Sequence, residues 1–238
     1  MAQVINTNVG ALFAGAALNK SAIGLQTAQE RLSSGLRINS AKDDATGLGI
    51  ATNYDKQVRG TNIAIRNAEN AISLAQTNDG YAKQITENLT RLYEIAVQLG
   101  GTASGAETTA LLAENLRIAG LTTAAAATTV DGNGTQATGV SATITAPTAT
   151  SIAGISADLT AVAASRANYG ADMVRFASAV ATMQTTSVNL SASFSRIMDT
   201  DYAAETASQA RNNILQQAGT AVLAQANQTP QNVLTLLR

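Results

Sequence analysis

A row of large apolar residues at every seventh position constrains this fold more than any other feature of the sequence. The row comprises Val162, Tyr169, Phe176, Met183, Leu190 and Ile197. A second row, offset by four residues, comprises Met173, Val180, Ser187 and Phe194. Two such rows are the a and d positions of a coiled-coil-like helix, and no proline interrupts them. We predict one long helix with a heptad core of Val162, Tyr169, Met173, Phe176, Val180, Met183, Leu190, Phe194 and Ile197.

The N-terminal third carries a similar but weaker heptad row of Val4, Ala11, Leu18, Leu25 and Leu32. Gly35 is well suited to end this helix in a left-handed cap. Residues 40–43 have the spacing of a capping box, with Asp43 in place of Glu, and Asp43 and Asp44 suit the first turn of the next helix. We expect that helix over about 45–99, loosened midway at Asp79-Gly80. Its apolar stripe is Ile65, Ala68, Ile72, Ala75, Ile85, Leu89, Leu92, Ala96 and Leu99.

The middle of the chain differs in composition from the two helical ends. The glycine-rich stretch 100–105 should break the second helix, and a short helix is expected over about 107–119. Residues 118–157 then hold one charged residue, Asp131. A turn signal at 131–134 and the alternation over 140–145 favour a small β-hairpin region, although a flexible surface loop has the same composition. A last helix is expected over 203–228 and should end at Pro230.

These elements predict a mainly α fold, in which long coiled-coil-like helices from both chain ends pack as a bundle around a small central β-hairpin region. The sequence has no His and no Cys, which excludes a Ser-His triad and the usual zinc sites. The acidic pairs Asp43-Asp44 and Asp199/Asp201 could form a metal or acid site, but capping and turn roles are favoured. We therefore predict no catalytic, cofactor-binding or metal site.

The net charge of −1 gives no footprint for nucleic acid or an anionic membrane. No apolar run approaches the roughly 20 residues of a membrane span. The N-terminus also lacks the basic and continuously apolar regions of a cleavable signal peptide. The chain is therefore expected either to stay inside the cell or to leave it by a route without signal cleavage.

Long motifs at both ends resemble bacterial flagellin. At the N-terminal end they are MAQVINTN, ERLSSGLRINSAKDDATGLGIA (30–51) and RNAENAISLAQTNDG (66–80). At the C-terminal end they are SRANYGA (165–171), SRIMDTDYAAE (195–205) and LAQANQTPQNVLTLLR (223–238). The chain departs from the family in one place, because GLTTAAAATTVDGNG (120–134) lacks the Phe of the usual Phe-Asn-Gly motif. That difference predicts a β-region that is shortened or differently packed.

The resemblance implies a structural subunit of the bacterial flagellar filament, which is secreted and extracellular and is not an enzyme. It implies a terminal helical domain of 1–46 plus 204–238, a rod domain of 47–203 with 118–157 as its low-charge segment, and no outer variable domains. The hook-filament junction protein is an alternative with similar ends. The C-terminal QANQTPQNVLTLLR and the ERLSSGLRINSAKDD run favour flagellin proper.

Partners also follow from the resemblance. The implied partners are copies of the chain, the flagellar export apparatus, a flagellin chaperone, and hook-associated and filament cap proteins, with no cofactor, nucleic acid or membrane. The terminal helices would order on assembly and contact neighbouring subunits. We expect the assembly residues to be Leu18, Leu25, Leu32, Leu215 and Val222.

Flagellins are also sensed by a host Toll-like receptor, and LTRLYEIAVQ (89–98) resembles the receptor-binding stretch. The resemblance implies contacts from Arg91, Glu94 and Ile95, with Ile95 replacing a Leu that is commoner there. Glu114 on the following helix matches a further contact. The alternative is that these charges are ordinary solvated or intersubunit groups.

Overall fold

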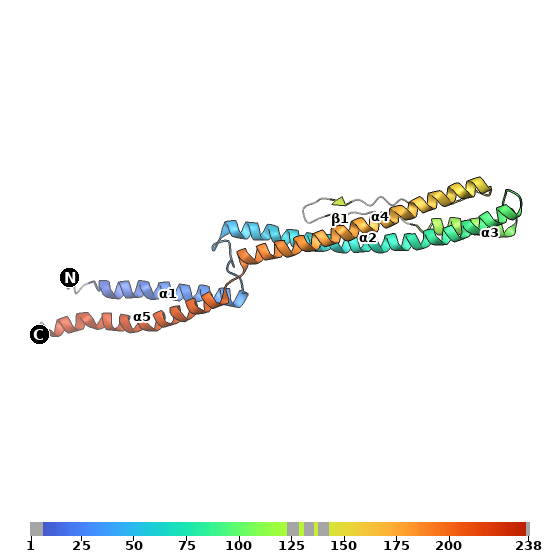
Figure 1. Cartoon of the computed structure of the whole chain (residues 1–238). Coiled ribbons are helices and arrows are strands. Elements are labelled where there is room, and N and C mark those ends of the chain that lie inside the picture. The colour runs from blue at the N-terminus through green and yellow to red at the C-terminus, as the bar shows by residue number, and fades with distance from the viewer. Residues whose placement is uncertain (1–6, 123–128, 131–135, 138–142, 237–238) are drawn as a thin grey trace. The chain divides into compact units, whose positions relative to one another are not determined.

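The computed structural model describes residues 7–122, 129–130, 136–137 and 143–236. It contains five helices in these ranges (Figure 1): α1 (Val9–Ser34), α2 (Ala45–Gln98), α3 (Ala106–Ala119), α4 (Ile152–Met198) and α5 (Tyr202–Leu236). The strands β1 (Thr129–Val130) and β2 (Gln136–Ala137) form an antiparallel pair. The predicted mainly helical fold, with the terminal helices packed together, is confirmed.

The chain divides into two compact units. The terminal unit comprises Met1–Asn53 and Ala192–Arg238, and the central unit comprises Tyr54–Ser191. Helices α2 and α4 each contribute to both units.

The ends of α1 are set by side-chain and glycine caps. Asn8 is the N-cap, and its Oδ1 accepts a hydrogen bond from the Ala11 N–H at 3.0 Å. Gly35 adopts φ 72° and donates its N–H to the Arg31 carbonyl at 2.8 Å, which confirms the predicted left-handed cap. Only glycine reaches this backbone region without strain. Val4, at the start of the predicted row, lies outside the described residues.

The start of α2 corrects the predicted capping box. Asp43 does not enter the first helical turn. Its Oδ2 instead accepts from the Ser40 and Asn39 backbone N–H groups at 3.0 and 3.1 Å, before the helix begins. Asp44 is the cap, because its Oδ1 accepts from the Gly47 N–H at 2.8 Å. The Asp43 bond to the Ser40 N–H is one of the two bonds of a capping box, but the N-cap of α2 is Asp44, four residues after Ser40.

Helix α2 runs without interruption to Gln98, so the predicted loosening at Asp79-Gly80 was wrong. Asp79 is fixed by Arg166 of α4, whose Nε donates to Asp79 Oδ1 at 2.8 Å. A glycine costs a helix only about 1 kcal/mol. Packing against α4 offsets that amount. The predicted break after α2 is confirmed, because Gly100, Gly101 and Gly105 all have positive φ.

Helix α5 corrects a second boundary. It passes through Pro230 and ends at Leu236, so the prediction that Pro230 terminates it was wrong. A proline removes one intrahelical hydrogen bond, and a helix can continue when another donor reaches the freed carbonyl.

The predicted strand over 140–145 does not form in its described part. Residues 143–145 have no regular secondary structure, and 138–142 lie outside the described residues, as does the predicted turn at 131–134. The Ile144 N–H instead donates to Thr122 Oγ1 at 3.2 Å, which ties this segment to the end of α3.

The core of the central unit lies mainly between α2 and α4, which run antiparallel. On α2 most of the buried residues alternate in steps of three and four. They are Thr61, Ala64, Ala68, Ala71, Ala75, Asn78, Ala82, Ile85, Leu89, Leu92 and Ala96. Ile65 and Ile72 of the predicted stripe are only partly buried, and Leu99 is exposed.

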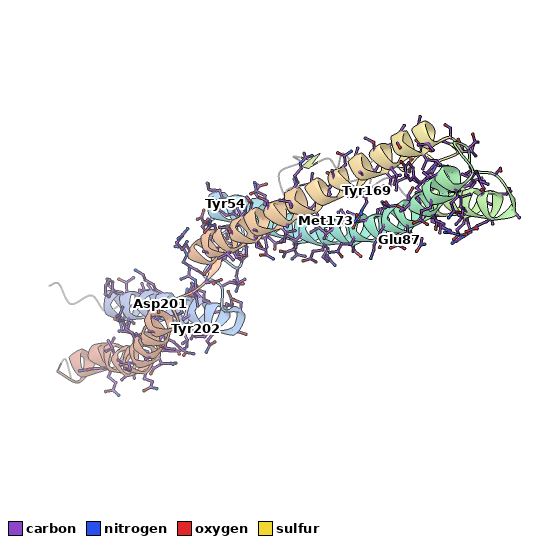
Figure 2. All side chains as sticks on the ribbon, turned by 45° about the vertical axis from the view of Figure 1, so that its right-hand side comes forward. Tyr54, Glu87, Tyr169, Met173, Asp201 and Tyr202 are labelled. Atoms are coloured by element: carbon purple, nitrogen blue, oxygen red, sulfur yellow. The ribbon has the colours of Figure 1, made fainter. Side chains whose placement is uncertain are left out.

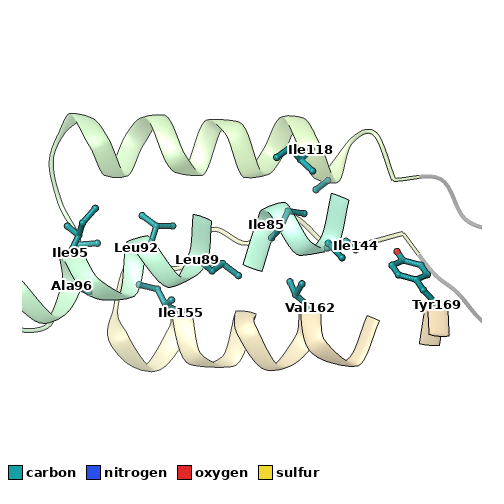
Figure 3. Packing of buried hydrophobic residues seen from close by; sticks show 13 residues of the cluster. Ile85, Leu89, Leu92, Ile95, Ala96, Ile118, Ile144, Ile155, Val162 and Tyr169 are labelled. Atoms are coloured by element: carbon teal, nitrogen blue, oxygen red, sulfur yellow. The ribbon is translucent and has the colours of Figure 1, made fainter. Parts of the chain in front are cut away.

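Large side chains of α4 pack where α2 has small ones. Phe176 clusters with Ala71, and Met183 with Ala64 and Ala68. Toward the other end, α2 supplies the large residues Ile85, Leu89 and Leu92, and there it lies between α3 and α4 (Figure 3). This complementarity of size keeps the helices close despite the low aromatic content.

The residues of the predicted heptad core differ in how deeply they are buried along α4. Val162, Tyr169, Phe176 and Met183 are buried, and Met173, Val180 and Leu190 are half-buried. Tyr169 and Met173 are labelled on α4 in Figure 2. Phe194 and Ile197, in the terminal unit, pack beside Ile38, Ala51 and Met198.

Tyr169 should make the central unit sensitive to alkali. Burial, and then the nearby Asp79 charge, raise the pKa of the Tyr169 hydroxyl above its ordinary value of 10.0. The pKa of Tyr169 is higher in the folded chain than in the unfolded chain. The contribution of neutral Tyr169 to stability is therefore complete below the unfolded pKa and is lost as the pH rises through the folded pKa. We expect thermal stability to fall above about pH 10, and less steeply in Tyr169→Phe. Circular dichroism melts at increasing pH measure this.

Tyr93→Phe is the control, because Tyr93 is 38% exposed in the same unit. Parallel pH profiles for wild type and Tyr169→Phe would show that Tyr169 is not the sensitive group.

Candidate assembly surface

Helices α1 and α5 form an antiparallel pair, and Figure 1 shows them side by side. On α1 the buried positions are small and seven residues apart: Ala14, Ser21 and Ala28. At one end of the pair, the hydroxyl of Tyr202, labelled in Figure 2, donates to the Leu32 carbonyl at 3.2 Å. Nearby, Arg31 and Glu205 form an ion pair at 3.6 Å. Small buried side chains let the two backbones approach closely.

Two glycines mark the closest approaches. A Cβ on Gly219 of α5 would lie 3.2 Å from Leu18 Cδ1, and a Cβ on Gly24 of α1 would lie 2.9 Å from Asn212 Nδ2. Leu18 of α1 therefore occupies the space beside Gly219, and Asn212 of α5 occupies the space beside Gly24.

The five predicted assembly residues separate into two groups. Leu18, Leu25 and Leu32 are half-buried along α1. Leu215 and Val222 of α5 are 50% and 55% exposed. The first group is therefore partly covered within the folded chain, and the second leaves about half of each side chain exposed.

Sequence reasoning missed several exposed apolar residues on α1. These are Val9, Phe13 and Ile23, and Phe13 is the most exposed of them at 78%. Leu12 of α1 and Ile214 of α5 are also exposed. Apolar residues on more than one face of α1 were the available signal, because a helix with a single partner needs only one apolar stripe.

A groove of about 660 Å³ runs along this helix pair. Phe13, Leu18, Leu215 and Val222 line it, together with small residues such as Gly219. Of these lining residues, Phe13, Leu215 and Val222 are each at least half exposed.

The connections between the terminal helices and α2 and α4 are also ordered. The Arg37 guanidinium donates to the Ile197 carbonyl at 2.9 Å, near the end of α4. Hydrogen bonds from the Ser40 and Asn39 backbone lower the pKa of the Asp43 carboxyl. Asp201 caps α5 by accepting from the Ala203 N–H at 2.9 Å.

The aspartates weighed as an acid or metal site therefore include caps at Asp44 and Asp201. Within the described ranges, no group of three His, Cys, Asp or Glu side chains is placed to hold a metal ion. None of the helices in that part of the chain combines the length and apolarity needed to cross a membrane.

The receptor-like residues lie in the central unit. The Arg91 Nε donates to Glu107 of α3 at 2.8 Å, and its Nη1 donates to Glu94 at 3.1 Å. Glu114 is paired with Arg117. Arg91, Glu94 and Glu114 are exposed, whereas Ile95 is 8% exposed and belongs to the core. Arg91 thus also has a structural role, because it joins α2 to α3.

Comparison with known protein families identifies the family of this chain. Residues 5–137 match the bacterial flagellin N-terminal helical region, and residues 152–237 match the bacterial flagellin C-terminal helical region. The chain belongs to the bacterial flagellin family. Members of this family are structural, non-enzymatic proteins of the extracellular flagellar filament.

Individual relatives within the flagellin family differ in length. The flagellar filament 31.3 kDa core protein of Treponema maltophilum is 32% identical, over 99% of this chain and 100% of the relative. Flagellin of Salmonella muenchen is 51% identical over 48% of this chain, and flagellin of Salmonella typhimurium is 55% identical over 41%. The chain matches only 23% and 20% of the length of these two Salmonella proteins.

Proposed function

We propose that this chain assembles with copies of itself into a helical filament through the exposed apolar residues of α1 and α5. The observation that carries the proposal is the apolar surface along this helix pair, where Phe13, Leu215 and Val222 are each at least half exposed. Burying a large apolar side chain contributes about 1.5–3 kcal/mol, so a few such residues supply a substantial contact. A head-to-tail contact that does not close on itself generates a filament.

In this proposal, residues 1–46 and 204–238 form the filament core. Residues 47–203 form a coiled-coil-like rod, with a small β-hairpin in the 118–157 segment and no outer variable domain. The 3-4 alternation of buried residues on α2 and the antiparallel pairing of β1 with β2 support this finer assignment. The proposed partners outside the filament are the flagellar export apparatus, a flagellin chaperone, and hook-associated and filament cap proteins.

Electron microscopy of the purified chain, concentrated under conditions that favour polymerisation, tests the proposal. Long filaments are the expected result. Short capped assemblies or persistent monomers would instead favour the hook-filament junction protein, a relative with similar ends.

We further propose that a Toll-like receptor contacts the exposed charges Arg91, Glu94 and Glu114. Ile95 would support this contact from the core, since its side chain is buried. Two of the three charges, Arg91 and Glu94, lie in the stretch of α2 that resembles the receptor-binding segment, and all three are exposed.

Arg91→Ala is expected to reduce the response of receptor-expressing reporter cells, because it removes an exposed cation from the proposed contact. Arg59→Ala is the matched control, because Arg59 is also on α2 and is 77% exposed in a pair with Asp55. Exposed ion pairs contribute little to stability, so both variants should remain folded. Equal responses from Arg91→Ala and Arg59→Ala would argue against the contact.

A further inference from the structure

Both polar atoms of the Asn8 carboxamide form hydrogen bonds. Its Oδ1 accepts from the Ala11 N–H at 3.0 Å, which is the N-cap of α1. Its Nδ2 donates to the Ala226 carbonyl of α5 at 2.8 Å. Asn8 and Ala226 are 218 positions apart in the sequence, so this bond joins the two ends of the chain.

Ala226 has a special position in α5, because it lies four residues before Pro230. In an α-helix the carbonyl of residue 226 accepts from the N–H of residue 230. A proline nitrogen carries no hydrogen, so residue 230 has no N–H to donate to that carbonyl. The Ala226 carbonyl is thus the acceptor that Pro230 leaves without its regular donor, and Asn8 supplies a donor to it.

We propose that Asn8 is a positioning residue that locks the start of α1 to the proline site of α5. The lock fixes the register of the pair, because only one carbonyl of α5 is freed by Pro230. It also makes the ordering of the two chain ends interdependent. The proposal concerns pairing within one chain and does not require the filament.

The chemistry explains why the residue is Asn. Ser and Asp cap helices as well as Asn does, but neither an Asp carboxylate nor a capping Ser hydroxyl offers the second, separate amide donor. Asn8→Ser therefore keeps an N-cap and removes only the bond to α5. Asn8→Asp also keeps the cap, and it places a negative charge toward the Ala226 carbonyl.

The test is a double-mutant cycle of Asn8→Ser and Pro230→Ala in the full-length chain. Asn8→Ser alone should lower the melting temperature by about 2–4 °C, the shift expected when one hydrogen bond is lost from a chain of this size. Asn8→Asp should lower it further. In the Pro230→Ala background the residue 230 N–H again reaches the Ala226 carbonyl. The same Asn8→Ser change should then produce little or no additional loss.

Asn53→Ser is the matched control, because Asn53 is exposed and donates to Gly49 within its own helix. Its effect should be the same with Pro230 or Ala at position 230. The cycle is measured by circular dichroism melts of the free chain and by thermal disassembly of filaments, followed by sedimentation. The filament measurement is needed because the terminal helices are expected to order on assembly. Equal losses from Asn8→Ser in both backgrounds, or no loss in either, would overturn the proposal.

Discussion

Truncating Leu92 to Ala is expected to lower the thermal stability of the central unit more than any other single change considered for that unit. Leu92 is fully buried in the cluster where α2 lies between α3 and α4 (Figure 3). A Leu→Ala change at such a site costs about 2–5 kcal/mol, because the lost apolar contacts leave a cavity. For a chain of this length that corresponds to a drop of roughly 5–15 °C in melting temperature. Circular dichroism melts measure it.

Leu116→Ala provides the matched control for Leu92→Ala. Leu116 lies on α3 in the same unit, but it is 62% exposed. Substitutions at such surface positions change stability by only about 0.5 kcal/mol. If the two variants melted together, the cluster around Leu92 would not be the core of this unit.

The core of α4 could be anticipated because its large residues recur every seven positions and stand out against Ala, Ser and Thr. The matching face of α2 was only partly visible, because half of it is alanine and alanine occurs on every face of these helices. Ile65 and Ile72 were therefore assigned to the stripe although Ala64 and Ala71 are the more deeply buried residues. Size complementarity between two helices is a property of the pair, and a single helix does not reveal it.

The candidate site was predictable to a smaller extent. The N-terminal heptad row indicated Leu18, and Leu215 and Val222 were expected as assembly residues. These predictions did not distinguish residues that pair α1 with α5 from residues that remain exposed. Phe13 was missed because its exposure depends on where α5 lies. The Ala226 carbonyl, four residues before Pro230 in α5, likewise accepts a hydrogen bond from Asn8, which is 218 positions away in the sequence. Local rules identify which residue can cap or break a helix, and tertiary contacts decide whether it does.

Replacing Gly219 by Val is expected to prevent filament formation, because it separates the two helices on which assembly depends. A Cβ at this position would already lie 3.2 Å from Leu18 Cδ1, and valine adds two methyl groups beyond it. Overpacking of this kind costs about 1–3 kcal/mol. Gly219→Ala should be nearly neutral, because the gain of about 1 kcal/mol in helix propensity offsets a small shift of Leu18. Sedimentation of assembled material and electron microscopy measure the result.

Gly15→Val is the control for Gly219→Val. It shows whether a loss of assembly comes from forcing the two helices apart or from any valine placed in the terminal unit. Gly15 lies on α1, but a Cβ there would meet nothing within 4 Å, so this variant should still assemble. The central unit should melt normally in both valine variants, because neither glycine belongs to it. Filaments of Gly219→Val in wild-type yield would mean that close contact between α1 and α5 is not needed for assembly. The exposed residues of each helix would then have to act independently, and pairing of the chain ends would lose its proposed role in building the filament.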